Sequence, residues 1–230
     1  MEQGIGTAAE RLLAAILPHV TFDGWSDAAF RAAAKDAGIA PELARAVCPR
    51  GALDLAVAFH RQGDRAMEAA LAAEDLAALR FRDRVARAVR LRLEGADREI
   101  VRRGASLFAL PRNAATGAGL IWGTADAIWR ALGDTSDDIN WYSKRATLAA
   151  VYSATVLFWL ADESEGHQAT WEFLDRRIEG VMRFEAFKTK VRENPVLGRM
   201  LEGPLKALGL VRPPAVAPWD LPGRVGGGRG

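Results

Sequence analysis

The residues best suited to a functional contact lie together in the segment ALGDTSDDINWYSKR, Ala131 to Arg145. Gly133 can adopt the left-handed backbone that closes a helix, and a polar turn of helix-starting side chains follows it. Trp141 and Tyr142 then fall on the first turns of a very apolar helix, with two basic residues close behind. Because an aromatic pair is costly to leave in water, we expect it to contact the core, a ligand or another protein.

The other reactive side chains are too scattered to predict a catalytic or metal site. The three histidines, His19, His60 and His167, occur without HxxH, ExxH or CxxC spacing. The sequence has no GxSxG elbow, no GxxxxGK[ST] loop and no strand-anchored GxGxxG. Cys48 is the only cysteine and is best interpreted as a small core residue, although a Cys–His dyad stays open. We therefore predict no enzymatic activity, no metal and no cofactor.

The composition predicts an all-α fold. Half of the 230 residues are hydrophobic, helix formers dominate, and no alternating strand pattern occurs. The net charge of +2 gives no general argument for nucleic-acid binding. The longest nearly apolar run, 146–161, is shorter than the roughly 20 residues of a membrane-spanning helix. The protein is therefore expected to be soluble, or attached to a membrane surface at most.

The first fifty residues have the layout of a helix-turn-helix module. Helices are predicted over 7–19, from the N-cap Ser26 to Gly38, and over 42–47. Within residues 21–50 the acidic and basic side chains cancel, and the predicted recognition helix PELARAV offers only Arg45 to a DNA groove. The sequence thus predicts the scaffold of a DNA-binding module without its DNA chemistry.

Longer helices are predicted for the rest of the chain, one of them running from 75 to 94 with Asp75 as its N-cap. The others are expected over 52–73, 97–107, 114–132, 138–160, 170–190 and 195–210. The predicted organisation is a helix-turn-helix-like module (1–50), a larger helical domain (51–190), an amphipathic C-terminal helix (191–210) and a disordered tail (211–230).

Two segments could contact a membrane. Between Arg80 and Arg112, ten arginines against four acidic residues leave an excess of six positive charges. This region is either a solvated face or a surface for anionic lipid or an acidic partner. In the C-terminal helix, one apolar face is either a reversible membrane contact or a packing face on the chain's own domain. That face carries Val196, Leu197, Met200, Leu201, Leu205 and Leu208.

Three stretches together resemble a family of lipid-binding accessory proteins of coenzyme Q (ubiquinone) biosynthesis. They are PRGALDLAVAFH (Pro49 to His60), WGTADAIWRALGDTSDDINWYSKRATLAAVYSATVLFWLAD (Trp122 to Asp162) and TWEFLDRRI (Thr170 to Ile178). The middle stretch is the most specific. The family is similar in fold to TetR-type regulators, so the resemblance implies an all-α, TetR-like helical bundle with a helix-turn-helix-like N-terminal module and an amphipathic C-terminal helix.

The resemblance also implies a function. Members of the family are homodimers that bind isoprenoid quinone precursors or phospholipid, lie on the membrane surface through the C-terminal helix, and present the lipid to a di-iron hydroxylase. The family's partner-contact patch corresponds to Asp138, Trp141, Tyr142 and Arg145. A set of apolar residues could line a tunnel for the isoprenoid tail, or could equally fill a closed core. This set is Trp122, Ile128, Trp129, Leu148, Tyr152 and Leu157.

The favoured interpretation is a non-catalytic lipid-binding protein of ubiquinone biosynthesis that binds no nucleic acid. The alternative is a TetR-type, ligand-responsive DNA-binding regulator. The chain starts almost directly at its first predicted helix, whereas an organellar member of the family would need an N-terminal transit peptide. We therefore expect a cytoplasmic protein, peripheral to the inner membrane of a bacterium. The helices after Thr170 are the expected dimer interface.

Overall fold

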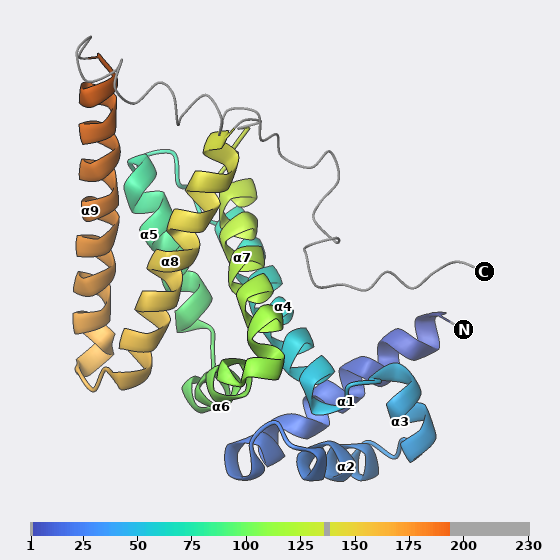
Figure 1. The fold of residues 1–230 in the computed structure, drawn as a ribbon. Coiled ribbons are helices and arrows are strands. Elements are labelled where there is room, and N and C mark those ends of the chain that lie inside the picture. Colours follow the sequence, from blue (N-terminus) through green and yellow to red (C-terminus); the bar gives the residue numbers. More distant parts are fainter. Residues whose placement is uncertain (1, 136–138, 194–230) are drawn as a thin grey trace. The chain divides into compact units, whose positions relative to one another are not determined.

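The fold is built from helices alone in the part of the chain that the computed structural model describes, residues 2–135 and 139–193. Two compact units make up this part (Figure 1): residues up to 73 together with 91–120, and residues 74–90 together with those from 121 onward. The helices are α1 (Glu2–Asp23), α2 (Asp27–Asp36), α3 (Pro41–Val47), α4 (Ala52–Ala73), α5 (Phe81–Glu94), α6 (Arg98–Ala109), α7 (Ala114–Ala131), α8 (Ile139–Ala161) and α9 (Gln168–Glu193), with short 3-10 turns η1 (Pro111–Asn113) and η2 (Glu165–His167). The all-α prediction is confirmed.

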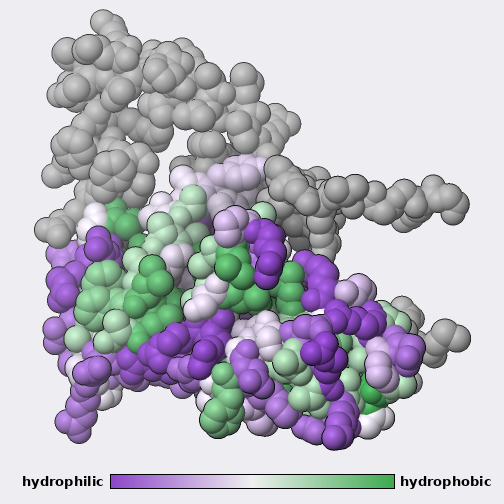
Figure 2. Space-filling model, turned by 60° about the horizontal axis from the view of Figure 1, so that its bottom comes forward, coloured by the Kyte–Doolittle hydropathy of each residue, from purple (hydrophilic) through white to green (hydrophobic). Residues whose placement is uncertain are grey.

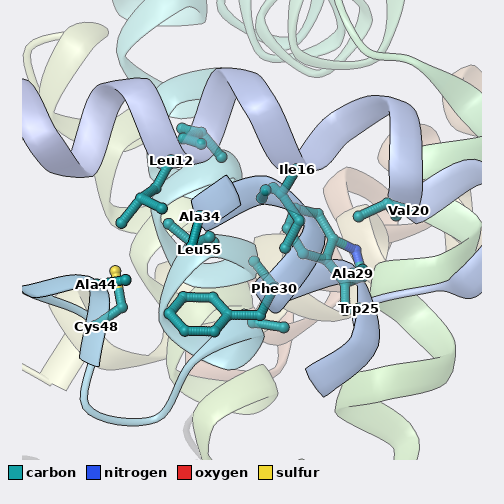
Figure 3. Close-up of a cluster of buried hydrophobic side chains, with 14 of the residues drawn as sticks. Leu12, Ile16, Val20, Trp25, Ala29, Phe30, Ala34, Ala44, Cys48 and Leu55 are labelled. Carbon is teal, nitrogen blue, oxygen red and sulfur yellow. The ribbon is translucent and has the colours of Figure 1, made fainter. Parts of the chain in front are cut away.

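The first unit closes around an apolar cluster from α1 to α4 (Figure 3). Leu12 and Ile16 of α1 are fully buried, and α2 turns Phe30 and three small alanine side chains toward them. Because alanine side chains are small, the backbones of α1 and α2 can pack closely. This cluster is the core that holds the helix-turn-helix-like module together.

Cys48 belongs to the same cluster and is buried there. Burial, followed by the negative charge of Asp54, raises the pKa of its thiol to about 11. The structure thus supports the interpretation of Cys48 as a small core residue.

The predicted helix signals of the first module are confirmed. Ser26 caps α2, since its hydroxyl oxygen accepts a hydrogen bond from the backbone N–H of Ala29 at 3.1 Å. Gly38 has a φ of +61° just after α2, where the chain needs the left-handed region. Pro41 begins α3 as its first residue. The first helix differs from the prediction, because α1 continues past Pro18 to Asp23.

The helix predicted from 75 to 94 begins six residues later, at Phe81. Asp75 does not cap a long helix. Its carboxylate instead accepts a hydrogen bond from the backbone N–H of Ala77 at 3.0 Å, which closes a local turn. The neighbouring Glu74 forms an ion pair with Arg87 at 2.6 Å. These contacts keep residues 74–80 as a connection.

The second unit contains α8 and α9, which lie side by side and antiparallel (Figure 1). Asp162, buried in the turn between them, accepts hydrogen bonds from the backbone N–H of Ser164 at 2.8 Å and of Thr170 at 2.9 Å. The Thr170 hydroxyl donates a third hydrogen bond to Asp162 at 2.5 Å. Hydrogen bonds from Ser164 and Thr170 hold the pKa of Asp162 far below its ordinary range. The carboxylate therefore stays charged and fixes the start of α9.

On the face drawn in Figure 2, hydrophobic residues reach the surface in patches among hydrophilic ones. Within the described ranges, no helix combines the length and the hydrophobicity that a membrane crossing requires. The exposed large apolar side chains there are Phe22, Leu43, Leu79, Phe81, Leu110, Leu157 and Phe158.

Candidate functional site

The turn after α7 brings Asp134 back toward the start of α8. Gly133 has a φ of +79°, as its predicted role in closing α7 requires. The backbone N–H of Asp134 then bonds the carbonyl of Trp129 at 3.0 Å. This geometry directs Asp134 toward the first turns of α8, where Lys144 donates to its carboxylate at 2.8 Å.

A buried arginine lies at the centre of this site. The side chain of Arg145 is only 2% exposed, and its Nε donates to Asp126 of α7 at 2.6 Å. Its Nη1 donates to Asp134 at 2.9 Å and to the backbone carbonyl of Trp141 at 3.2 Å. The guanidinium carbon also lies 4.1 Å from the centroid of the Trp141 ring, within the range of a cation–π contact. One side chain thus joins α7, the turn and α8.

Three aromatic rings pack beside this arginine. The Trp141 and Tyr142 rings meet edge to face with their centroids 4.8 Å apart. Trp122 of α7 lies 5.9 Å from Trp141 and 6.4 Å from Tyr142. All three residues are half-buried, so the cluster packs on the protein and still reaches the surface. Aromatic side chains in this setting are frequent anchors of binding surfaces.

A second aromatic group surrounds Trp129. Its ring stacks on Phe81 with the centroids 5.4 Å apart, and the ammonium of Lys144 lies 5.2 Å from its centroid. The indole N–H of Trp129 donates to the backbone carbonyl of Lys144 at 3.1 Å. Trp129 therefore joins α7 to α8 through this hydrogen bond, and its side chain is half-buried.

The four residues predicted to contact a partner differ in their exposure and orientation. Trp141 and Tyr142 are half-buried and reach the surface, whereas Arg145 points inward to two carboxylates. Asp138 lies outside the described residues. Their partner-binding role stays a prediction. Sequence reasoning missed Asp126, whose Arg130 ion pair at spacing i,i+4 was the available signal.

The six residues predicted to line a lipid tunnel also differ in their exposure. Ile128, Leu148 and Tyr152 are buried, as core residues are. Trp122 and Trp129 are half-buried, and Leu157 is 65% exposed near the other end of α8. Their lipid-binding role therefore stays a prediction. The six residues predicted to contact the membrane, Val196, Leu197, Met200, Leu201, Leu205 and Leu208, lie outside the described residues.

The first unit holds a second buried charged group. Arg92 of α5 is 4% exposed, donates to Asp64 of α4 at 2.7 Å, and donates to the carbonyl of His60 at 3.0 Å. The His60 ring lies 3.7 Å from Asp64. Burial lowers the pKa of His60 to about 4, with Asp64 opposing the shift and Arg92 adding to it. The histidine is therefore neutral at pH 7.

The charged side chains of the described ranges form ion pairs rather than a metal site. Across residues 2–135 and 139–193, no three His, Cys, Asp or Glu side chains are grouped so that they could hold a metal ion. Most of the arginines between 80 and 112 pair with acids of their own unit, which supports a solvated face more than a free cationic surface. These pairs are Arg80 and Arg82 with Asp83, Arg87 with Glu74, Arg90 with Asp175, Arg92 with Asp64, and Arg102 and Arg103 with Glu99.

Residues 114–185, which contain this site, match the model of the COQ9 family. The chain is 30% identical over 191 residues to the probable mitochondrial ubiquinone biosynthesis protein coq9 of Dictyostelium discoideum, covering 80% of this chain and 62% of that protein. It is 40% identical over 80 residues to the mitochondrial ubiquinone biosynthesis protein COQ9 of Rattus norvegicus, covering 35% and 26%. The chain thus spans less than two thirds of the length of these relatives. The predicted family resemblance is confirmed.

A solved structure is similar to this chain in fold. The TetR transcriptional regulator of Nitrosomonas europaea superposes with a TM-score of 0.61 at 17% identity, over 74% of this chain and 95% of that one. At this identity the likeness concerns the fold alone. It confirms the predicted TetR-like architecture.

The predicted location, cytoplasmic and peripheral to a bacterial inner membrane, is wrong. The relatives from Dictyostelium discoideum, Rattus norvegicus and Drosophila melanogaster are all named as mitochondrial proteins of eukaryotes. The prediction depended on how the chain begins, and the first residues of a helix carry no physical information about a compartment.

Proposed function

Because residues 114–185 match the COQ9 family, we propose that this chain is a non-catalytic lipid-binding protein of ubiquinone biosynthesis. In this proposal it binds an isoprenoid quinone precursor or a phospholipid at a membrane surface and presents it to a di-iron hydroxylase. The observation that carries the proposal is the Trp141–Tyr142 pair. It reaches the surface at the start of α8, inside the matched segment, and packs on Trp122.

The hydroxylase would dock on this aromatic pair. Half-buried aromatic rings next to charged side chains bury a large apolar area and lose little conformational freedom on binding. Lys144, paired with Asp134 beside the cluster, adds a charged rim. Such a surface suits a protein partner better than it suits catalysis.

The lipid would lie along the apolar faces of α7 and α8. Trp122 and Trp129 on α7 are seven residues apart and therefore share one face of that helix. Both are half-buried, so a lipid tail could contact the two rings without displacing the buried core around Ile128. The isoprenoid tail is the ligand chemistry that fits rings of this kind.

Lipid binding is tested by organic extraction and mass spectrometry of protein purified without detergent. We expect a co-purified isoprenoid quinone precursor or phospholipid. A lipid-free protein that also fails to bind liposomes would contradict this part of the proposal.

Partner binding is tested by titrating the quinone hydroxylase of the same organism with two variants. Trp141→Ala should weaken the complex at least tenfold, because an aromatic anchor is worth about 2 kcal/mol or more when truncated. Phe22→Ala removes an aromatic ring that is 83% exposed in the other unit and should leave the affinity unchanged. Equal affinity of both variants would exclude the Trp141 surface as the docking site.

A DNA-binding regulator is the second candidate, favoured by the TetR-like fold. Arg45, the one cation of α3, pairs with Asp27 of α2, and its guanidinium lies 4.9 Å from the centroid of the Phe30 ring. These contacts give Arg45 partners within its own module, which argues against the DNA-binding alternative. Salt-sensitive, site-specific DNA binding by the purified protein would support this alternative.

A further inference from the structure

We propose that Asp126, Asp134 and Arg145 position the aromatic pair Trp141–Tyr142 for binding. Arg145 then acts from inside the protein rather than by contacting the partner. The biological use of this arrangement rests on the proposed function, but the arrangement itself can be tested without any partner.

The three charged residues come from separate elements and meet in the interior. Asp126 lies on α7, Asp134 in the following turn, and Arg145 on α8, 19 and 11 residues away from the two acids. The Arg145 and Asp134 side chains are almost fully buried, at 2% and 3% exposed. A guanidinium bonded to two carboxylates through two different nitrogens has a fixed plane and position.

Two contacts join this fixed plane to Trp141. The Arg145 guanidinium lies 4.1 Å from the centroid of the Trp141 ring, and its Nη1 donates to the Trp141 carbonyl at 3.2 Å. Trp141 in turn meets the Tyr142 ring edge to face at 4.8 Å. The guanidinium therefore sets the height and tilt of the indole, and the indole limits where the phenol ring can lie.

Stability alone does not account for a buried group of this kind. Apolar residues of similar volume often replace a buried ion pair without loss, because taking the charges out of water is costly. Two carboxylates fix the orientation of a guanidinium plane, and apolar residues in the same space do not reproduce this effect. The geometry thus points to a positioning role for all three residues.

The test uses the intact chain labelled with 5-fluorotryptophan, which gives one ¹⁹F signal for each of its seven tryptophans. Trp141→Phe assigns the signal of interest. The main variant combines Asp126→Asn, Asp134→Asn and Arg145→Met, so that these three residues become uncharged at similar volume. Arg130→Met is the matched control: Arg130 also bonds Asp126, at 3.0 Å, but its side chain is 62% exposed.

We expect the Trp141 signal of the triple variant to shift and broaden, with the Trp25, Trp159 and Trp171 signals unchanged. The affinity for the purified quinone hydroxylase should fall at least tenfold. Arg130→Met should keep both the Trp141 signal and the affinity. Arg145→Lys, which keeps the charge without the planar fork, is the milder second variant and should show the same changes at smaller size.

An unchanged Trp141 signal in both the triple variant and Arg145→Lys would overturn the inference. It would also be overturned if the triple variant bound the hydroxylase with full affinity while the single variant Trp141→Ala did not bind it. Failure of the proposed function gives a different result. In that case Trp141→Ala binds the hydroxylase as the unsubstituted protein does, while the Trp141 signal still reports whether the network positions the ring.

Discussion

At the scale of single residues, Gly63 shows how one missing side chain makes room for a buried charge. A Cβ atom at this position would lie 2.6 Å from the guanidinium carbon of Arg92. That guanidinium is held by Asp64 at 2.7 Å and by the carbonyl of His60 at 3.0 Å. Arg92 therefore has little freedom to move away from an added methyl group.

We predict that Gly63→Ala destabilises the protein by about 1–2 kcal/mol. The weakened buried ion pair outweighs the roughly 1 kcal/mol that alanine gains over glycine in a helix. The control is Gly119→Ala in α7, where a Cβ would meet nothing within 4 Å and alanine should stabilise. Urea unfolding of both variants measures the two free energies, and a Gly63→Ala protein as stable as Gly119→Ala would contradict the explanation.

His60 predicts a specific pH dependence of stability. Burial first, and then the cations Arg92 and Arg61, lower its pKa in the folded protein from 6.5 to about 4, against the pull of Asp64. Above pH 6.5 the ring is neutral in both states and contributes no pH dependence. Between pH 6.5 and 4 only the unfolded chain gains the proton, so the free energy of unfolding falls by up to about 1.4 kcal/mol per pH unit.

The variant His60→Gln isolates this contribution. It lacks the titrating ring, so its free energy of unfolding should fall less steeply than that of the unsubstituted protein between pH 6.5 and 4. Denaturant unfolding at a series of pH values gives both curves. If the two curves ran parallel across this range, the assignment of a buried neutral His60 would be incorrect.

At the scale of helices, Ser26 predicts a measurable capping energy. Ser26→Ala removes the acceptor of the Ala29 N–H and should destabilise the protein by about 1 kcal/mol. Ser106→Ala is the matched control, because Ser106 is exposed within α6 and bonds the Arg102 carbonyl of its own helix. There alanine should be neutral or slightly stabilising. The midpoints of thermal unfolding of the two variants measure the difference. Equal midpoints for Ser26→Ala and Ser106→Ala would contradict a stabilising role for the cap.

The helices were largely predictable because their end signals are local. Ser26, Gly38 and Gly133 each act within a few residues of their own position, so the sequence places the ends of α2 and α7 well. Asp75 has the right type for an N-cap but closes a turn with Ala77 instead. A capping residue and a turn residue have the same side chain, and only the packing of the following helix distinguishes them.

The orientation of side chains at the site was less predictable. Trp141 and Tyr142 were rightly placed at the start of a helix, yet Arg145, on the same turns, points inward. Its partners Asp126 and Asp134 belong to other elements, and sequence spacing on a single helix does not reveal such pairs. The sequence therefore predicted the position of the aromatic site but not its charged interior.

At the scale of the whole molecule, we predict a homodimer that uses α8 and α9. Leu157 is 65% exposed and Phe158 is 36% exposed, and the Phe158 ring stacks on Phe173 of α9 at 4.6 Å. Adjacent exposed apolar side chains of this kind are typical of interfaces. Leu157→Lys should shift the mass measured by light scattering from dimer to monomer, because a buried unpaired charge is costly.

The control for this prediction is Leu43→Lys on α3, which is 48% exposed on the other unit. It should keep the dimer mass at the same protein concentration. A monomeric unsubstituted protein, or a dimer that Leu157→Lys leaves intact, would show that this surface does not join two copies.

The burial of Cys48 has a practical consequence for such measurements. A thiol is reactive only as the thiolate, and a pKa of about 11 leaves almost none of it at pH 7. A maleimide dye or spin label should therefore ignore Cys48 and react with a cysteine introduced at an exposed position. The natural chain can thus serve directly as the background for single-site labelling, and the dimer prediction can be tested by label-to-label distances without first removing a native thiol.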